Sequence, residues 1–474
     1  MSHQATPADD SRGRLARRLA AGLIGLGVLG MGASFVATNP LHLGEDLAEG
    51  PDAVLPGDAV AYLELDAEPG LGQQAEALAY AGKLPSLRRM LSGERTDVRQ
   101  LAWQRLAPAE CRGVVDFDRD LRPWLGQRIG VALRDGAELP VMAFEATDEQ
   151  AAREGARKIA SCWPGGLGRG VAWQQGYLLL AADQAAADSA QQKAAEDPLT
   201  TGERHAQDLT KVGTRGFVTW WATRSGLEQV ADLSHWSDET RERLATAPLV
   251  STGGTLRMGE GSPEVRTVAK LTTELKTSQH STALGDLPAD SSLAVGLAEG
   301  DVAVDETWPV VSRWLAQRDI ELTPEQAKTL LGRDARLAVG PRREGGRAWS
   351  LSTYTDRGPL EQLLAEHEKA GDVQIASGTP KVPILAPKHD AAWAEHVSTT
   401  DDHLGEHNPF KFGVAKSDQA QLAVFVNLDE YREQVRRQFP YLDEADLAAL
   451  QAFGLAAHVE DANYVVAVGR ITAH

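Results

Sequence analysis

An internal repeat limits this chain to a small set of folds. The segment LPGDAVAYLELD at residues 55–66 returns as LPADSSLAVGLA at residues 287–298, an offset of 232 residues. Four further landmarks follow in the same order at offsets of 200 to 208 residues: LGQRIGVAL and LGRDARLAV from Leu125 and Leu331, ATD and YTD ending at Asp148 and Asp356, LEQV and REQV ending at Val230 and Val435, and VRTVAKLT and VVAVGRIT from Val265 and Val465. So long a period predicts two tandem copies of one domain.

Each predicted copy alternates between strand and helix patterns. Copy one covers residues 54–273 and copy two residues 286–474, with a polar linker at 274–285. The larger first offset gives copy one about 26 additional residues between Asp58 and Leu125. Neighbouring alternating segments such as RIGVAL and VMAFEA predict antiparallel hairpins, and segments with apolar residues three and four apart predict helices. We therefore predict an α+β class for both copies, with helices packed on antiparallel sheets.

The apolar segment near the N-terminus has two opposed interpretations. Gly25, Gly27 and Gly30 have the spacing of a dinucleotide-binding fingerprint. That fingerprint needs a buried strand before the glycines, but a segment with four arginines stands there instead. Residues 19–37 carry no charge, and as a helix they would span about 28 Å, enough to cross a bilayer. The sequence therefore predicts a transmembrane helix at 19–37.

The flanks of this segment predict how the chain is placed in the membrane. Arg12, Arg14, Arg17 and Arg18 precede it and acidic residues follow it, which orients a basic cytoplasmic tail, residues 1–18, by the positive-inside rule. A stalk at 38–53 then leads to extracytoplasmic domains.

A cleaved signal peptide is the alternative to this anchor, since both have a basic region and an apolar core. Cleavage after Ala37 or Ala33 would place Phe35 or Met31 where a small residue is preferred. We favour an uncleaved, single-pass anchor in the cell membrane, in contact with the lipid bilayer through residues 19–37.

Net charge and cysteine content narrow the classes of partner and compartment. The formal net charge of -19 argues against nucleic acid as a partner, because both surfaces are acidic. The two cysteines, Cys111 and Cys162, both fall in the part predicted to be extracytoplasmic, where a disulfide persists. A bond between them would close a loop of about fifty residues, and two separate buried thiols are the alternative.

Several segments resemble one known family. They are the basic N-terminal segment with its single span, then LPGDAVAYLELD, EPGLGQQAEALAYAGKLPSL with its Gly72-Gln73 pair, LRPWLGQRIGVAL and the ATDEQAA helix start. Together they resemble the uncharacterised actinobacterial single-pass membrane proteins catalogued as domain of unknown function family 3352. The resemblance implies an envelope location and supplies no activity or catalytic residue. Copy two lacks the GQQAEALAYAGKLP segment, so the copies are not expected to share one ligand.

Signatures of the common envelope enzymes do not occur in the sequence. No G-x-S-x-G elbow, H-E-x-x-H helix, S-x-x-K with K-T-G, or P-loop is present. The matched carboxylates Asp58 with Asp290 and Asp148 with Asp356 are candidates for acid/base work. Their contexts favour turn and helix-start roles instead.

A histidine-rich segment is the remaining candidate for chemistry. His389, His396, His403 and His407 fall among acidic residues, a combination that suits divalent transition metals. A helical step from His403 to His407 would place both rings on one face. The alternative is a solvated loop.

Two adjacent tryptophans are the candidates for a partner surface. Trp220 and Trp221 would lie on opposite faces of one strand, so that one is core and the other is free to be exposed or covered.

We expect an uncharacterised extracytoplasmic protein of the bacterial cell envelope, a non-catalytic binding or scaffolding module for an unknown protein or polymer, without a cofactor. The alternatives are a cell-wall enzyme with an unrecognised active site and a metal-binding accessory protein that uses residues 389–407.

Overall fold

The computed structural model describes two compact units. The described residues are 50–474 except 87, 89–96, 98, 101–102, 105–106, 164–166, 235, 276–280, 301–302, 305–311, 313–321, 344–345, 367–371, 377–381 and 439–441. Contacts divide the chain into unit 1, Met1–Thr273, and unit 2, Glu274–His474. The predicted tail, transmembrane helix and glycine fingerprint lie outside the described residues. Within the part that is described, no helix is both long and apolar enough to cross a membrane.

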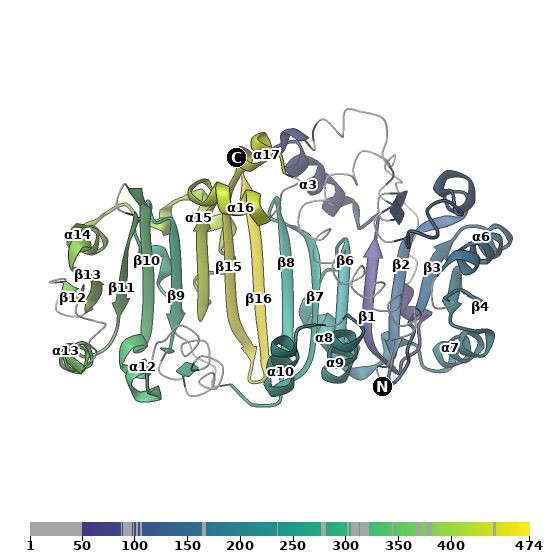
Figure 1. The fold of residues 1–474 in the computed structure, drawn as a ribbon, viewed down its shortest axis with the longest axis horizontal. Coiled ribbons are helices and arrows are strands. Elements are labelled where there is room, and N and C mark those ends of the chain that lie inside the picture. The colour runs from purple at the N-terminus through teal and green to yellow at the C-terminus, as the bar shows by residue number, and fades with distance from the viewer. Residues whose placement is uncertain are drawn as a thin grey trace, which may run out of the picture. The chain divides into compact units, whose positions relative to one another are not determined.

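Unit 1 is built on eight strands, all paired antiparallel to their neighbours (Figure 1). From one side to the other their order is β4-β5-β3-β2-β1-β6-β7-β8. The strands are β1 (Ala59–Asp66), β2 (Leu125–Arg134), β3 (Val141–Ala146), β4 (Gly170–Gln174), β5 (Tyr177–Ala181), β6 (Val218–Thr223), β7 (Leu249–Gly259) and β8 (Ser262–Leu271).

Unit 2 is likewise built on eight antiparallel strands. Their order is β12-β13-β11-β10-β9-β14-β15-β16, so that each strand of unit 2 takes the position of the strand eight numbers lower in unit 1. The strands are β9 (Leu293–Ala298), β10 (Asp334–Arg343), β11 (Gly346–Thr353), β12 (Val373–Ala376), β13 (Ile384–Pro387), β14 (Leu422–Asn427), β15 (Leu450–Asp461) and β16 (Tyr464–Ala473).

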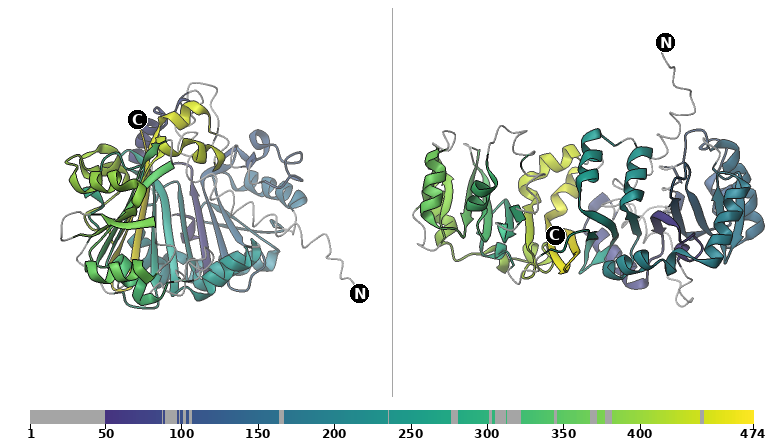
Figure 2. Two further views of the ribbon diagram at one scale, coloured as in Figure 1. Left: turned by 60° about the vertical axis from the view of Figure 1, so that its left-hand side comes forward. Right: turned by 90° about the horizontal axis from the view of Figure 1, so that it is seen from below.

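Helices connect the strands of each unit and lie over them (Figure 2). The mixed class of helices and antiparallel strands predicted from the sequence is confirmed in this general form. Unit 1 has α3 (Leu71–Ala81), the π-helical turn η2 (Phe117–Leu121), α6 (Glu149–Cys162), α7 (Gln184–Glu196), α8 (Glu203–Val212), α9 (Arg224–Leu233), α10 (Asp238–Thr246) and the 3-10 turns η1 (Pro51–Ala53) and η3 (Leu199–Thr201). Unit 2 has α12 (Pro324–Leu331), α13 (Arg357–Glu366), α14 (Ala391–Thr399), α15 (Asn408–Gly413), α16 (Arg432–Gln438), α17 (Glu444–Ala449) and the 3-10 turns η4 (Leu284–Asp286), η6 (Lys388–Asp390), η7 (Leu404–Glu406) and η8 (Leu428–Tyr431).

Polar side chains start several of these helices by accepting an otherwise unpaired backbone amide. Asp148 caps α6 by accepting from the amide of Ala151, and Asp183 caps α7. At α12, Thr323 and Gln326 cap each other's amides in a reciprocal capping box. These local signals explain why helices begin where the alternating pattern of a strand ends.

Each unit has its own hydrophobic core. In unit 1, Trp124 is fully buried among residues of β2, β3, β5 and α6. Helix α6 can approach it because Gly155 has no side chain, since a Cβ there would lie 2.5 Å from Nε1 of Trp124. In unit 2, Trp393 of α14 and Phe410 of α15 pack with residues of β9, β10, β14 and β15. Two separate cores allow each unit to be considered as a folding unit.

Backbone hydrogen bonds at the start of each unit are also equivalent. The amide of Leu199 donates to the carbonyl of Leu55 at 2.9 Å, and the amide of Leu404 donates to that of Leu287 at 2.8 Å. The isolated bridge between Pro56 and Pro198 is matched by the bridge between Pro288 and His403. Leu55 and Leu287 are 232 residues apart, as are Pro56 and Pro288, which is the offset of the opening LPGD segment.

Candidate functional site

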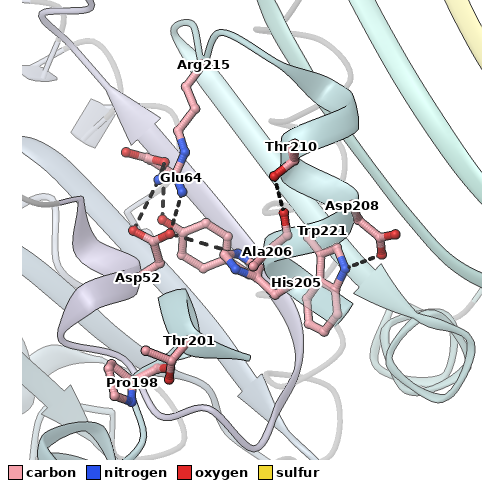
Figure 3. Close-up of polar contacts among 11 residues, drawn as sticks. Asp52, Glu64, Pro198, Thr201, His205, Ala206, Asp208, Thr210, Arg215 and Trp221 are labelled. Carbon is pink, nitrogen blue, oxygen red and sulfur yellow. Dashed lines mark hydrogen bonds and ion pairs between the residues drawn. The ribbon is translucent and has the colours of Figure 1, made fainter. Parts of the chain in front are cut away.

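The most unusual chemistry of the described residues is a buried ion-pair cluster in unit 1 (Figure 3). Asp52 and Glu64 have only 1% and 3% of their surface exposed. A single guanidinium serves both, because Arg215 lies 2.5 Å from Oδ2 of Asp52 and 3.1 Å from Oε2 of Glu64. A buried carboxylate without a partner destabilises a fold by several kcal/mol, so the cluster depends on this arginine.

Three separate segments bring these charges together. Asp52 lies in η1, Glu64 in β1, and Arg215 in the connection between α8 and β6. All three residues of η1 are buried, and the turn rests on β2, where a Cβ on Gly130 would lie 2.5 Å from Cβ of Pro51. The chain segment that follows residues 1–49 is therefore held against the sheet by packing and by an ion pair. The end of the predicted stalk, residues 50–53, is part of the fold of unit 1 and not a linker.

Three aromatic residues, Tyr62, His205 and Trp221, pack together beside the ion pairs. The hydroxyl of Tyr62 donates to Oε2 of Glu64 at 3.2 Å. The His205 ring meets Tyr62 and Trp221 edge-on, with centroid distances of 5.5 and 5.2 Å. Trp221 in turn donates from Nε1 to Asp208 at 2.8 Å.

His205 is the buried imidazole of this group. It is 2% exposed, and neither ring nitrogen has a hydrogen-bond partner among the described residues. Its Nε2 lies 4.0 Å from Oδ2 of Asp52. A histidine in such a position is held mainly by packing.

Burial shifts the pKa values of Glu64 and His205 so that the neutral form of each is favoured. Desolvation raises the pKa of Glu64 from 4.5 to about 7, against the opposing charge of Arg215 and with a further increase from Asp52. Desolvation lowers the pKa of His205 from 6.5 to about 4, although the nearby charge of Asp52 favours protonation. The stability of unit 1 should therefore respond to pH in opposite directions through these two residues.

The equivalent place in unit 2 has a different arrangement of charge, in which the buried Arg336, the cross-strand partner of Gly296, lies 3.3 Å from Asp286 and 3.0 Å from Asp334. Glu64 pairs across the sheet with Gly130 and Thr219, and the residue with the matching neighbours in unit 2 is Gly296. A Cβ on Gly296 would lie 2.0 Å from Oγ1 of Thr282, which occupies the space of the missing side chain.

Apolar residues of unit 2 stand at the positions of four other residues in and around the cluster. Leu284, Ala294, Phe410 and Phe425 belong to the hydrophobic core of unit 2, and stand at the offset positions of Asp52, Tyr62, His205 and Trp221. The cluster is a property of unit 1 alone within the described residues.

The four histidines of the predicted metal segment have separate partners. His396 contacts Asp290 at 3.0 Å and His407 contacts Asp402 at 2.6 Å, while Nδ1 of His403 lies 2.9 Å from the carbonyl of Asp286. His389 is largely exposed, 3.6 Å from Asp390. Across the described ranges, no group of three or more His, Cys, Asp or Glu residues is placed to hold a metal ion.

The expected helical face between His403 and His407 is wrong. The two residues flank the three-residue turn η7, and both have extended backbone conformations. Helix α15 starts only after His407, with Pro409 in its first turn. A proline is readily accepted there because that position needs no amide donor.

The matched carboxylates have structural partners, with one exception. Both oxygens of Asp58 accept from Arg134, at 2.9 and 2.6 Å, and Asp290 contacts His396 as described. Asp148 caps α6. Asp356 is exposed just before α13. Within each unit the two carboxylates do not come together, because one lies near the end of a central strand, β2 or β10, and the other near its start.

The remaining sequence-predicted residues fall into place as follows. Cys111 and Cys162 are joined by a disulfide with a Cα–Cα distance of 5.0 Å. Trp221 is buried, whereas Trp220 is half-buried and its ring lies over Gly254.

The residues of the ion-pair cluster were not singled out by sequence reasoning. One signal was available, because Glu64 interrupts the apolar alternation of β1 on the same side as Tyr62. No local pattern marks Arg215 or Asp52, since they meet only in the folded chain.

Comparison with protein-family models, curated proteins and solved structures gave no match for this chain.

Proposed function

We propose that this chain is a single-pass membrane protein of the bacterial cell envelope whose two units, copies of one duplicated domain, form a non-catalytic binding or scaffolding module outside the cytoplasm. The observation that carries the location is the disulfide between Cys111 and Cys162. It uses both cysteines of the chain, and such bonds persist in oxidising compartments. The arginine-flanked apolar segment at 19–37 and the family resemblance favour the same location.

The duplication is supported by the strand order that the two units share. It is supported further by the cross-strand neighbours of Glu64 and Gly296, which match at the offsets seen in the sequence. Independent origins would not require the same order over eight strands, because many orders satisfy the rules of antiparallel pairing.

The ion-pair cluster gives unit 1 the role of holding the attachment to the predicted anchor, which unit 2, being later in the chain, does not need. Asp52 lies at the end of the predicted stalk, so its bonds to Arg215 hold the point at which unit 1 joins the stalk. Twelve residues, 38–49, remain between the predicted anchor and this point. Fully extended they reach about 40 Å, which keeps the attachment point of unit 1 close to the membrane.

Burial supports the non-catalytic interpretation. Asp52, Glu64 and His205, which have the chemistry of acid/base groups, are at most 3% exposed. The member of the cluster that meets solvent is Arg215, whose side chain is 36% exposed, and a guanidinium does not release its proton in proteins. The contacts of the cluster are those of a structural clamp.

Fusion of a reporter to the C-terminus of the full chain tests the location. An alkaline phosphatase fusion should be active and a cytosol-dependent fluorescent fusion dark, and without reduction the protein should resist labelling by a maleimide reagent. A reporter active only in the cytosol, or two reactive thiols in the native protein, would refute the location.

A photo-reactive amino acid tests the binding role. Leu78 on α3 is 46% exposed and belongs to the segment that copy two lacks. Crosslinking there should capture a partner that a probe at the exposed Glu154 of α6 does not. Recovery of lipid only, or the same products from both positions, would argue against the binding role.

A further inference from the structure

The outer edge of strand β4 in unit 1 is blocked by side chains of α7. The amide of Val171 donates to Oε1 of Gln184 at 3.2 Å, and Nε2 of Gln184 donates to the carbonyl of Val171 at 3.0 Å. About two helical turns further, Nε2 of Gln191 donates to the carbonyl of Trp173 at 2.7 Å. These glutamines occupy the backbone groups through which another strand would pair.

The equivalent strand of unit 2, β12, has no such block. Helix α14 follows β13 as α7 follows β5, with Asp390 at its N-cap where α7 has Asp183. Its first residue is Ala391 where α7 has Gln184, and seven residues later Ser398 stands in place of Gln191 and bonds its own helix at Glu395.

The position of α14 explains the difference. Trp393 draws this helix over the face of the sheet, where its Nε1 donates to the carbonyl of Ala338 at 3.3 Å and its ring covers Gly340. Helix α7, in contrast, packs along β4. In the described part of unit 2, no side chain bonds the outer edge of β12, Val373–Ala376.

The sequence of β12 leaves this edge able to pair. Its residues VQIA include no charge and no proline, the two features that usually protect an exposed edge. Val373 and Ile375 lie on one side of the strand and are half-buried. A second strand of the same kind would add apolar cross-strand contacts on that side.

We propose that β12 pairs antiparallel with β12 of a second copy of this chain. A two-fold axis brings identical, uncharged strands together in the antiparallel sense that every pair within each unit already has. The blocked edge of β4 prevents the alternative in which β12 of one copy adds to β4 of the next, so this contact closes as a dimer. The pairing needs only the fold of unit 2 and stands or falls separately from the membrane location.

Cysteine crosslinking of the purified full chain in detergent tests the pairing. Both native cysteines are in a disulfide, so one introduced thiol is the only reactive one. Around a two-fold axis the residue nearest the axis meets its own copy at about 4.5–5.5 Å between Cα atoms, within the range of a disulfide. Mild oxidation of Gln374→Cys or Ile375→Cys should give linked dimers at several times the yield of Ala365→Cys, a control on the exposed side of α13.

A second pair of variants separates pairing from chance collision. Gln374→Lys places like charges near the axis and should reduce the dimer seen by sedimentation, while Gln374→Thr should keep it. A wild-type chain that sediments as a monomer, equal crosslinking at positions 365 and 374–375, or a dimer unchanged by Gln374→Lys would each overturn the proposal. Recovery of a different protein on β12 in place of a second copy would overturn it as well.

Discussion

Replacement of Glu64 by glutamine tests the energetics of the buried cluster most directly. The pKa of Glu64 is raised from 4.5 to about 7, and the side chain is 4% exposed, so solvent screens it little. Each pKa unit corresponds to about 1.4 kcal/mol. The folded state therefore disfavours the ionised carboxylate by about 3 kcal/mol relative to the unfolded chain.

The direction of the pH dependence follows from the raised pKa. The protonated carboxyl contributes its full stability below pH 4.5, and this contribution is lost as the pH rises through 7. Glutamine keeps an oxygen that can accept from Arg215 and Tyr62 but does not ionise. The stability of Glu64→Gln relative to wild type should therefore rise by about 3 kcal/mol between pH 4.5 and 8.

Thermal unfolding of the full chain measures this difference. For a unit of this size, about 3 kcal/mol corresponds to a relative shift in Tm of roughly 6–12 °C. Tryptophan fluorescence can follow the transition, because Trp221 contacts His205 within the cluster. Glu154→Gln, which removes an exposed carboxylate from unit 1, is the matched control. If the Glu64→Gln and wild-type curves stay parallel from pH 5 to 8, burial does not perturb Glu64 and the electrostatic account of the cluster is wrong.

Three further perturbations test other parts of the structure. The stability of His205→Phe relative to wild type should rise by about 3 kcal/mol as the pH falls from 7 to 4. The lowered pKa of His205 makes its stability contribution present above pH 6.5 and lost on acidification through pH 4. If the histidine is accessible to water, the melting curves of the two proteins will not diverge across that range. Cys111→Ser with Cys162→Ser should lower the free energy of unfolding by about 4 kcal/mol relative to the oxidised wild type, the loop-closure entropy of a 51-residue separation. Denaturant titration measures this difference, and the reduced wild type should unfold like the double variant. Gly130→Ala should displace η1 and speed proteolysis near residue 50, whereas Gly113→Ala, with nothing within 4 Å of the added Cβ, should not; equal cleavage of the two variants would mean that η1 is not held by packing on β2.

The sequence predicted the general architecture because apolar residues recur at short intervals that differ between strands and helices. Alternation and helical spacing identified the hairpins that became β2–β3 and β10–β11, and the repeat landmarks fall at matching elements of the two units, such as β1 and β9 or α9 and α16. The start of α6 shows where local signals stop being sufficient. Asp148 and the adjacent Thr147 are both capable of capping this helix, but Asp148 caps it, while Thr147 bonds the carbonyl of Trp124 at 3.4 Å. Either side chain can accept an amide, and only the path of the chain into the helix selects one.

The histidine segment shows the limit of composition as evidence for a site. Four imidazoles among carboxylates have the right chemistry for a metal, yet three of them are used in separate contacts to Asp290, Asp402 and the backbone of Asp286. A metal site requires convergence of side chains in three dimensions. Spacing along an irregular segment does not determine that convergence.

The amino-acid sequence alone predicted the repeat and the alternation of strands and helices, and it contains the apolar segment at 19–37 and two cysteines. These features are periodic, contiguous or countable, so they survive without coordinates. Only the tertiary structure decided that Asp52 and Glu64 share Arg215 across separations of 163 and 151 residues. It also decided that Gln184 and Gln191 bond the outer edge of β4, across separations of 13 and 18 residues, while no described side chain of unit 2 bonds the matching edge of β12. The ion pairs need strands and turns far apart in the chain to meet, and the glutamines need α7 to pack along β4, and no local pattern encodes either arrangement.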